Sequence, residues 1–390
     1  MTQDTLQNKK SKKLFLIFHG RLPSNKAASL FAAKSAEAFA EEGVQVVLMV
    51  SRRLGREKGN PYEYYKVKNN FSIVYLPILD IHFPSFIESF RFVLSYVSFS
   101  LFCLLYLLRF AKNEDIIYSN EYLPLFFASA VFRNTFYEMH DFPENCRGIF
   151  GIFIRRMKWV LIHNNWKAKT AEEIFDINKN KIICEANAVQ IEDFDIALSK
   201  EEARQKLSLP NDKKVVVYTG HLYSWKGVDT LAFAATKLPK NYLVVFVGGT
   251  PEDIRKLEDA HKRTTNILIV GWKQHSEVPI WQKAADVLVL PNTAKENISK
   301  YYTSPMKLFE YMASMRPIVA TDIPSIREIL GETNAIIVLP DDPDAMAEGI
   351  KKAIDDESLT KTIIEKAYRD VELRTWKKRA GRILDFIEKK

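Results

Sequence analysis

The sequence predicts an α/β protein with two domains, each built on a parallel sheet. Short apolar runs alternate with amphipathic stretches in both halves, which is the pattern of strand–helix–strand units. The length of 390 residues exceeds what one ordinary core accommodates, so two domains are favoured. Hydrophobic residues make up 47% and charged residues 27% of the chain, and these values exclude general disorder.

The first half is predicted to contain a series of short buried strands. The run L-F-L-I-F at residues 14–18 is the first strand, and residues 27–42 form a helix that ends at Gly43. Further strands are expected at residues 44–50, 116–118, 135–137 and 181–184.

The second half restarts the rhythm at residue 213 with V-V-V-Y-T-G, followed by a helix at residues 228–238. Further strands are expected at residues 243–247, 267–270, 287–290 and 318–320. An acidic, polar linker is expected at residues 189–199, and a basic amphipathic helix at residues 376–387. We therefore place the domains at residues 1–190 and 191–373.

The positive charge is concentrated in the first half. Residues 1–190 carry 25 Lys and Arg against 18 Asp and Glu, whereas residues 191–390 carry 31 against 30. A basic half suggests an acidic partner. Because the basic residues are scattered and no nucleic-acid module is recognisable, nucleic acid is not the expected partner.

The three cysteines, Cys103, Cys146 and Cys184, include no CxxC pair and are odd in number. This argues against a disulfide framework and a structural zinc site, and it favours a reducing compartment. The first apolar run is too short for a signal peptide, so a cytoplasmic protein is expected.

Residues 92–108 form a run of 17 residues without a charge. This length is at the lower limit for a transmembrane helix, which needs about 20 apolar residues. Two interpretations stay open: a buried or membrane-surface helix, and a true span.

Residues 218–227, Y-T-G-H-L-Y-S-W-K-G, combine a strand end, a turn glycine and a Lys-Gly pair before a helix. Gly220 would let the backbone approach a ligand, and Lys226 adds a positive charge near a helix N-terminus. Together they suit a diphosphate. The alternative is an ordinary strand–turn–helix with a solvated lysine.

Residues 303–312, T-S-P-M-K-L-F-E-Y-M, are typical of a helix start. Ser304 is expected as the N-cap and Pro305 in the first turn. Lys307 and Glu310 share one face, and the carboxylate could accept hydrogen bonds from the diol of a ribose. The alternative is a capped surface helix with a weak Lys–Glu pair.

Two further motifs follow strand ends of the first half, where ligands of open α/β sheets collect. In Y-E-M-H-D, His140 could exchange a proton with a sugar hydroxyl, although a lone loop histidine is more often structural. In H-G-R, Gly20 is a turn glycine flanked by basic groups, and the alternative is a simple strand-to-helix connection.

Taken together, the motifs resemble those of the family-4 retaining glycosyltransferases, which have the GT-B fold. The resemblance covers almost the whole chain. It is carried by H-G-R-L-P-S-N-K-A-A-S, Y-E-M-H-D, C-E-A-N-A-V, G-H-L-Y-S-W-K-G, V-G-G, V-G-W, A-D-V-L-V-L-P-N and S-P-M-K-L-F-E-Y-M-A-S-M-R-P-I-V-A-T, in this order. It implies two Rossmann-like domains facing a central cleft, with residues 374–390 crossing back to the first domain. It also implies a nucleotide-sugar donor held mainly by the second domain, and no metal or other cofactor.

The resemblance also implies roles for individual residues. Lys226 would bind the donor diphosphate, Glu310 the ribose, and His140 would lie near the transferred sugar as the catalytic candidate. Gly20 falls on the loop that closes over diphosphate and acceptor. The other donor-binding candidates are Gly220, His221, Gly248, Trp272, Lys273, Ser304, Pro305 and Lys307.

Two positions depart from the family pattern. Tyr302 stands where the family often has a first glutamate, and His221 stands where it often has arginine. The expected activity is transfer of a hexosyl or related group to a lipid-linked or saccharide acceptor at the cytoplasmic membrane face, in cell-surface glycan or glycolipid synthesis. The alternative is a catalytically impaired nucleotide-sugar-binding protein, because of Tyr302.

An anionic membrane surface is a further expected partner. No acidic residue lies between Glu144 and Glu172, where basic side chains such as Arg155, Arg156 and Lys158 alternate with large apolar ones. The alternative is that the aromatic residues belong to the core and the charges to a solvated helix face.

Overall fold

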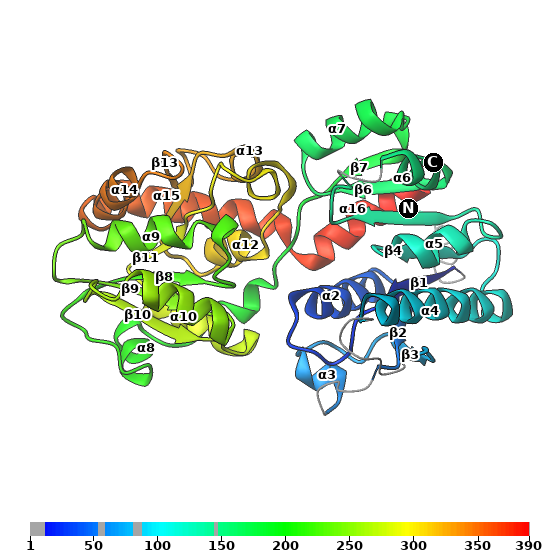
Figure 1. The fold of residues 1–390 in the computed structure, drawn as a ribbon, viewed down its shortest axis with the longest axis horizontal. Coiled ribbons are helices and arrows are strands. Elements are labelled where there is room, and N and C mark those ends of the chain that lie inside the picture. The colour runs from blue at the N-terminus through cyan, green and yellow to red at the C-terminus, as the bar shows by residue number, and fades with distance from the viewer. Residues whose placement is uncertain (1–11, 54–58, 81–87, 144–146, 390) are drawn as a thin grey trace. The chain divides into compact units, whose positions relative to one another are not determined.

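The computed structural model describes residues 12–53, 59–80, 88–143 and 147–389. The chain divides into two compact units: unit 1 comprises Met1–Glu185 and Trp376–Lys390, and unit 2 comprises Ala186–Thr375 (Figure 1). The sequence placed these boundaries at residues 190 and 373. In the structure Val189 forms a parallel bridge with Thr375, so both boundary segments pair inside unit 2.

Unit 1 contains a seven-stranded parallel sheet in the order β3-β2-β1-β4-β5-β6-β7. Its central strands are buried on both faces, as expected for a parallel sheet covered by helices. The strands are β1 (Lys13–Phe18), β2 (Gln45–Ser51), β3 (Ser72–Leu76), β4 (Ile116–Ser119), β5 (Thr135–Met139), β6 (Trp159–Ile162) and β7 (Ile182–Cys184).

The helices of unit 1 include α16, which ends the chain and packs beside α2 (red and blue in Figure 1). The edge of the Trp376 ring meets the ring of Phe31 on α2, with centroids 5.2 Å apart. The helices are α2 (Ala27–Glu41), α3 (Pro61–Tyr64), α4 (Glu88–Phe110), α5 (Tyr122–Ala128), α6 (Arg147–Arg156), α7 (Asn165–Phe175) and α16 (Trp376–Glu388).

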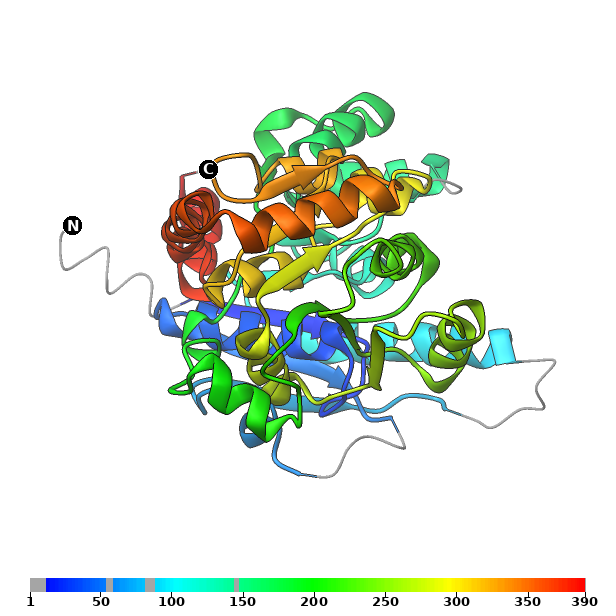
Figure 2. The ribbon, with the colours of Figure 1, turned by 90° about the vertical axis from the view of Figure 1, so that its left-hand side faces the viewer.

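Unit 2 contains a six-stranded parallel sheet in the order β10-β9-β8-β11-β12-β13. The strands are β8 (Lys214–Thr219), β9 (Tyr242–Val247), β10 (Ile267–Gly271), β11 (Val287–Leu290), β12 (Ile318–Thr321) and β13 (Ile336–Val338). The larger helices are α8 (Lys200–Lys206), α9 (Val228–Ala235), α10 (Pro251–Ala260), α11 (Val278–Ala284), α12 (Met306–Ala313), α14 (Pro343–Asp355) and α15 (Glu357–Val371), with α13 (Pro324–Arg327) a single turn. Helix α14 packs on β12 and β13 (orange in Figure 2).

The predicted fold class of two parallel-sheet, Rossmann-like domains is confirmed, and so are the strands predicted in each half. Three strands were missed. The edge strand β3 has only one fully buried residue, Leu76, and β13 has only three residues. Strand β6 begins directly after Lys158, inside the segment that was interpreted as a basic and aromatic surface.

That surface interpretation is wrong for most of its aromatic residues. Phe150, Phe153 and Trp159 are buried, as the alternative interpretation required. In contrast, Ile149 and Ile152 on α6 are 80% and 57% exposed. The helical period explains the difference, because residues three apart return to the same face.

The apolar run at residues 92–108 lies in α4, whose segment Arg91–Phe110 is long and apolar enough to cross a membrane by length and composition. One face of α4 is buried in unit 1 through Phe99, Cys103 and Leu107, and the helix packs on α5 and β3. Its other face exposes large apolar side chains. Helix α4 is therefore a layer of the folded unit with an uncovered apolar side. Cys103 is buried, Cys184 is exposed, and Cys146 lies outside the described residues.

In both sheets the strand order reverses beside the first strand. Strand β1 lies between β2 and β4, and β8 lies between β9 and β11. Loops from the two directions diverge at the carboxyl ends of these strands, which is where open α/β sheets bind ligands. Of the predicted site residues, Gly20 follows β1, Gly220 and His221 follow β8, and Gly248 follows β9.

Candidate active site

The turns after β8 and β9 pack backbone against backbone. Gly220 and Gly248 have φ angles of +121° and +129°, which residues with side chains rarely adopt. A Cβ atom at Gly248 would lie 2.2 Å from the carbonyl oxygen of Gly220, and one at Gly220 would lie 2.9 Å from Nζ of Lys307. Both positions therefore require glycine, and a lysine ammonium lies directly against the first turn.

Two lysines converge beside these turns. Lys307 Nζ lies 3.7 Å from the centroid of the Tyr218 ring, and Lys226 Nζ lies 3.7 Å from that of Trp225. Within the described residues, Lys307 Nζ is buried without a hydrogen-bond partner. Burial lowers the pKa of Lys226 to about 7, and burial together with the charge of Lys226 lowers the pKa of Lys307 well below its usual range. Two ammonium groups without a paired carboxylate form a site for an anion.

His221 does not add charge to this anion site. Its ring stacks on Tyr223, with centroids 4.9 Å apart and planes at 3°. Burial and the nearby Lys226 and Lys307 lower the pKa of His221, so the imidazole is neutral at pH 7.

The start of α12 differs from its prediction. The N-cap position is Pro305, in extended conformation, and no side chain caps the helix. The Ser304 hydroxyl instead accepts a hydrogen bond from the backbone N–H of Asn187 at 3.2 Å. The Asn187 side-chain amide donates to the Ser304 carbonyl at 2.5 Å. The asparagine of the C-E-A-N-A-V motif thus holds the loop that precedes α12.

Glu310 lies on α12 and is 8% exposed. No ion pair joins it to Lys307 among the described residues, so the weak Lys–Glu pair considered above is absent there. Glu310 Oε1 lies 3.1 Å from Nε2 of His275, a residue that the sequence did not single out. The Tyr311 hydroxyl accepts the backbone N–H of Thr219 at 2.8 Å, which fixes α12 against the end of β8.

Trp272 and Lys273 follow Gly271, the last residue of β10. The Trp272 side chain is 48% exposed, so its ring is available for stacking. The next residues form the short turn His275–Glu277, and His275 connects this segment to Glu310. Tyr302 ends the π-helical turn Ile298–Tyr302 and brings no carboxylate to the site.

In unit 1, His140 follows β5 and belongs to a buried polar cluster around Glu138. The Glu138 carboxylate is fully buried and accepts hydrogen bonds from Arg379 Nη2 at 2.6 Å, from His163 Nε2 at 2.8 Å and from the Tyr118 hydroxyl. His140 Nε2 lies 3.2 Å from the same oxygen, Oε1. Burial opposes ionisation of Glu138, but Arg379 and His140 hold its pKa well below the usual range.

The cluster also positions the His140 ring and backbone. The ring meets Phe31 edge-on, with centroids 4.8 Å apart, and packs against His163 at 4.7 Å. The Lys167 ammonium donates to the His140 carbonyl at 2.9 Å. Glu138, His140 and His163 could offer ligand atoms to a metal ion, but the guanidinium of Arg379 already supplies the positive charge beside Glu138. The geometry is that of an ion pair that orients a histidine.

Gly20 follows β1, and a Cβ atom there would lie 2.1 Å from the Phe18 ring, so a larger residue would require Phe18 to move. The adjacent His19 is buried, and its ring nitrogens face Arg53 and Ser95. Burial and Arg53 lower the pKa of His19 to about 3. His19 is therefore a neutral core residue, whereas Gly20 remains at the surface of the loop.

The comparisons with known proteins find similarity to glycosyltransferases. Residues 199–370 match the family described as glycosyl transferases group 1. The chain is 28% identical over 210 residues to an uncharacterised glycosyltransferase of Methanocaldococcus jannaschii, covering 51% of each protein. It is 26% identical over 184 residues to the α-D-kanosaminyltransferase of Streptomyces kanamyceticus, covering 46% of each. A putative teichuronic acid biosynthesis glycosyltransferase of Bacillus subtilis is 28% identical over 154 residues, or 40% of this chain and 36% of that one.

The chain spans about half the length of the curated relatives that it matches. Solved structures match over 97% of the chain. They include sucrose-phosphate synthase of Thermosynechococcus elongatus (TM-score 0.76, 16% identity, 98% of that chain) and the Anabaena protein HepE in complex with UDP and glucose (TM-score 0.73, 17% identity, 99% of that chain). These likenesses show the fold, which is GT-B.

The Glu138–Arg379 pair gives a prediction about stability. The variant Arg379→Leu leaves a buried carboxylate without its cation, so the free energy of unfolding of unit 1 should fall by about 3–5 kcal/mol. Differential scanning calorimetry would measure the transition of this unit. The double variant Arg379→Leu/Glu138→Gln should recover much of the loss, because no charge is then stranded. A double variant as unstable as the single one would contradict this account.

Proposed function

We propose that this chain is a retaining glycosyltransferase that moves a sugar from a nucleotide-sugar donor to a hydroxyl of a saccharide or lipid-linked acceptor. The observation that carries the proposal is the pair of lysines, Lys226 and Lys307, at the point where the strand order of unit 2 reverses, with Lys307 Nζ buried without a hydrogen-bond partner among the described residues. The match of residues 199–370 to glycosyl transferases group 1 supports it. The relative named for teichuronic acid biosynthesis supports a place in cell-surface glycan or glycolipid synthesis.

The donor diphosphate would lie on the two lysines, over the turns at Gly220 and Gly248. Glu310 would accept hydrogen bonds from the ribose hydroxyls, with His275 holding its other side, and Trp272 and Lys273 would border the base. Ser304 and Pro305 would approach through their backbone. Because HepE was solved in complex with UDP and with UDP-glucose, UDP-glucose is the first donor to test.

The chemistry follows from where charge develops. The bond between the anomeric carbon and the diphosphate oxygen breaks, and the negative charge on the leaving group is stabilised by Lys226 and Lys307. The acceptor hydroxyl attacks from the same face and gives its proton to the leaving phosphate. No side-chain nucleophile is assigned. We propose that the two lysines replace a metal ion, and that His140 acts on a hydroxyl of the transferred sugar.

A second candidate is a nucleotide-sugar-binding protein without turnover. Tyr302 favours it, since this position lacks the carboxylate that the family often uses. Both candidates bind the donor, so turnover of a bound nucleotide sugar separates them.

The donor site is tested by a thermal-shift screen with UDP, GDP and ADP and their sugar conjugates in the presence of EDTA. A ligand at about 100 times its Kd should stabilise the protein by about 2.7 kcal/mol. The variant Lys226→Ala should weaken binding of the active nucleotide by about 10- to 100-fold, because a charge-assisted contact is lost. Lys262→Ala, at an exposed lysine on the same unit, is the matched control. Equal binding by both variants would remove the diphosphate assignment.

The low pKa of Lys226 predicts a pH dependence of nucleotide binding. The free lysine loses its proton as the pH rises through about 7, whereas a bound diphosphate raises its pKa. Binding above pH 7 must then take up a proton, and affinity should fall by at most about tenfold per pH unit for each proton taken up. Isothermal titration calorimetry with UDP in two buffers of different ionisation enthalpy measures this uptake. In Lys226→Met, fewer protons should be taken up when UDP binds. An unchanged number of protons would mean that a group other than Lys226 takes up the proton.

We further propose that unit 1 docks on the cytoplasmic face of an anionic membrane. The outer side of α4 exposes Leu101, Leu105 and Leu108, at 48%, 60% and 53%. Helix α5 packs beside α4, and the Arg156 guanidinium of α6 covers Phe126 of α5 at 5.1 Å. The exposed Ile149 and Ile152 of α6 therefore continue the same layer. Large apolar side chains beside arginines suit a bilayer surface with anionic lipids.

Sedimentation with vesicles tests this docking. The protein should sediment with phosphatidylcholine vesicles that contain phosphatidylglycerol, and added salt should reduce the bound fraction. Leu105→Gln combined with Arg109→Glu should weaken binding, whereas Leu339→Gln, at an equally exposed leucine of unit 2, should not. Recovery of the wild type in the supernatant under all conditions would leave a glycosyltransferase without a membrane role.

A further inference from the structure

Three arginines of unit 1 come together at the carboxyl ends of β1 and β2, where the strand order of that sheet reverses. Arg21 lies in the loop after β1, Arg53 follows β2, and Arg91 lies in the first turn of α4 (β1, β2 and α4 in Figure 1). Open α/β sheets bind ligands at such strand ends. None of the three belongs to the donor site described above.

Arg53 is a cation with few partners. Its Nη2 donates a hydrogen bond to the Ser95 hydroxyl at 3.1 Å and lies 2.8 Å from Nε2 of His19. Its Nε is buried, and among the described residues this atom has no hydrogen-bond partner. Burial and the charge of Arg21 lower the pKa of Arg53, but a guanidinium keeps its proton at neutral pH. Arg53 is therefore a charged group with donors left unused.

Arg21 is the second cation of this kind. Its guanidinium forms no hydrogen bond or ion pair with any described residue, and its Nε is buried. The backbone around it is nevertheless fixed. The Ser29 hydroxyl donates to the Arg21 carbonyl at 3.0 Å, and the Ser51 hydroxyl donates to the carbonyls of His19 and Gly20 at 3.0 and 3.2 Å. Because the loop is held on both sides, little loop entropy is lost when a ligand binds to it.

Arg91 differs, because a carboxylate already neutralises it. Its Nε donates to Asp80 Oδ1 at 2.8 Å. This hydrogen bond lowers the pKa of Asp80, and the charges of Arg53 and Arg21 add to the effect, so all three arginines lie near this carboxylate. Burial raises the pKa of the other nearby carboxyl group, Glu121, which accepts a backbone N–H from the loop after β1. Positive charge is therefore in excess at this end of the sheet.

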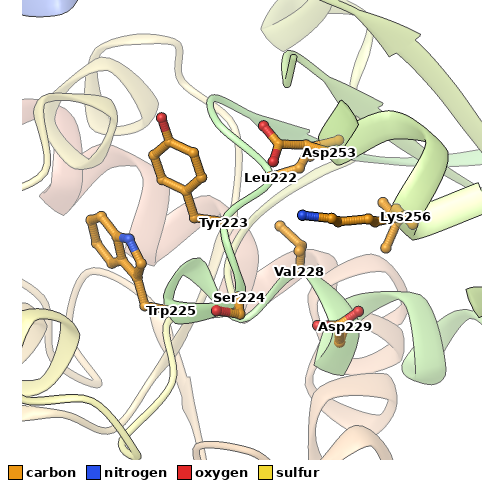
Figure 3. Close-up of a pocket in the computed structure, with 9 residues that line it drawn as sticks. Leu222, Tyr223, Ser224, Trp225, Val228, Asp229, Asp253 and Lys256 are labelled. Carbon is orange, nitrogen blue, oxygen red and sulfur yellow. The ribbon is translucent and has the colours of Figure 1, made fainter. Parts of the chain in front are cut away.

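An open crevice on unit 2, with a volume of about 500 Å³, has a different charge character (Figure 3). Its lining includes Asp229 and Asp253, and the one cation among its described lining residues is Lys256. The Lys256 ammonium is already paired with Glu252 at 2.8 Å. This crevice therefore has no excess positive charge for an anion, in contrast to the arginines of unit 1.

We propose that Arg21 and Arg53 bind a phosphate group, and that this phosphate belongs to the acceptor substrate. A guanidinium can donate two parallel hydrogen bonds to phosphate oxygens, and two such groups match the two negative charges of a phosphate monoester. The donor diphosphate is assigned to Lys226 and Lys307 of unit 2, so a second phosphate on unit 1 is that of the other substrate. This last step rests on the proposed function, whereas phosphate binding by unit 1 does not.

A phosphorylated sugar and a lipid phosphate both carry this group. A surface for an apolar chain lies beside the arginines, because Phe92, next to Arg91 on α4, is 56% exposed. The Phe92 ring meets the His19 ring edge-on, with centroids 6.0 Å apart. The experiment therefore includes one probe of each kind.

Isothermal titration calorimetry on the full chain tests the site, with glucose 6-phosphate, farnesyl phosphate and the uncharged farnesol as probes. The titrations are made with and without saturating UDP, which keeps the probes from the lysines of unit 2. Tighter binding of farnesyl phosphate than of glucose 6-phosphate would assign a lipid phosphate as the ligand, and the reverse order would assign a phosphorylated sugar. Farnesol bound as tightly as farnesyl phosphate, with glucose 6-phosphate unbound, would overturn the phosphate site.

The variants Arg21→Gln and Arg53→Gln should each weaken binding of the phosphate probe by about tenfold or more, because each removes a charge-assisted contact. Arg52→Gln, at the exposed arginine next to Arg53, is the matched control and should change binding by less than about twofold. Arg21→Gln removes no hydrogen bond or ion pair within the described residues, so it should keep the thermal transition of the wild type.

UDP binding by the same variants separates the two proposals. Both arginine variants should keep the wild-type affinity for UDP, because the donor site belongs to unit 2. Phosphate binding that depends on the arginines, in a protein that does not bind UDP, would keep this site and overturn the proposed function. Absence of binding of both phosphate probes, or equal binding by the wild type and both arginine variants, would overturn the site.

Discussion

The Lys307 ammonium group, buried without a hydrogen-bond partner among the described residues and close to the partly buried Lys226, is the constraint around which unit 2 is arranged. An unpaired buried charge is costly, so the surroundings must hold it in place. The ammonium group of Lys307 lies over the Tyr218 ring, and that of Lys226 lies over the Trp225 ring. Gly220 leaves room for Lys307 because it has no side chain. The Tyr311 hydroxyl holds α12, which carries Lys307, against Thr219. Binding of an anion beside the lysines would offset the free-energy cost of burying this group without a partner.

Unit 1 also contains a buried charged group, Glu138, but this group has hydrogen-bond donors around it. Glu138 is surrounded by donors, and its main partner, Arg379, comes from the last helix of the chain. That helix also presents Trp376 to Phe31, and Phe31 in turn contacts His140. The return of the chain to unit 1 therefore completes the core beneath the histidine. Removing Arg379 would destabilise unit 1, because Glu138 would lose its cation. In unit 2, by contrast, no described carboxylate forms an ion pair with Lys226 or Lys307.

The sequence predicted the elements whose signal is local. Runs such as V-V-V-Y-T-G marked buried strands correctly, because this signal depends only on neighbouring residues. The sequence could not identify hydrogen-bond partners that lie far apart along the chain. Arg379 meets Glu138 across 241 positions, and His275 meets Glu310 across 35. Ser304 has the composition of an N-cap, yet its hydroxyl meets Asn187 from 117 positions away. Tertiary contacts decided these cases.

The aromatic residues of the loop 221–225 show how a short segment can hold a lysine in place. In sequence they look like scattered loop residues, but in the structure the rings of His221, Tyr223 and Trp225 stack. Lys226 continues the stack and belongs to the anion site as well. The stacked rings thereby restrict the motion of the Lys226 ammonium group, so less side-chain entropy is lost when an anion binds to it.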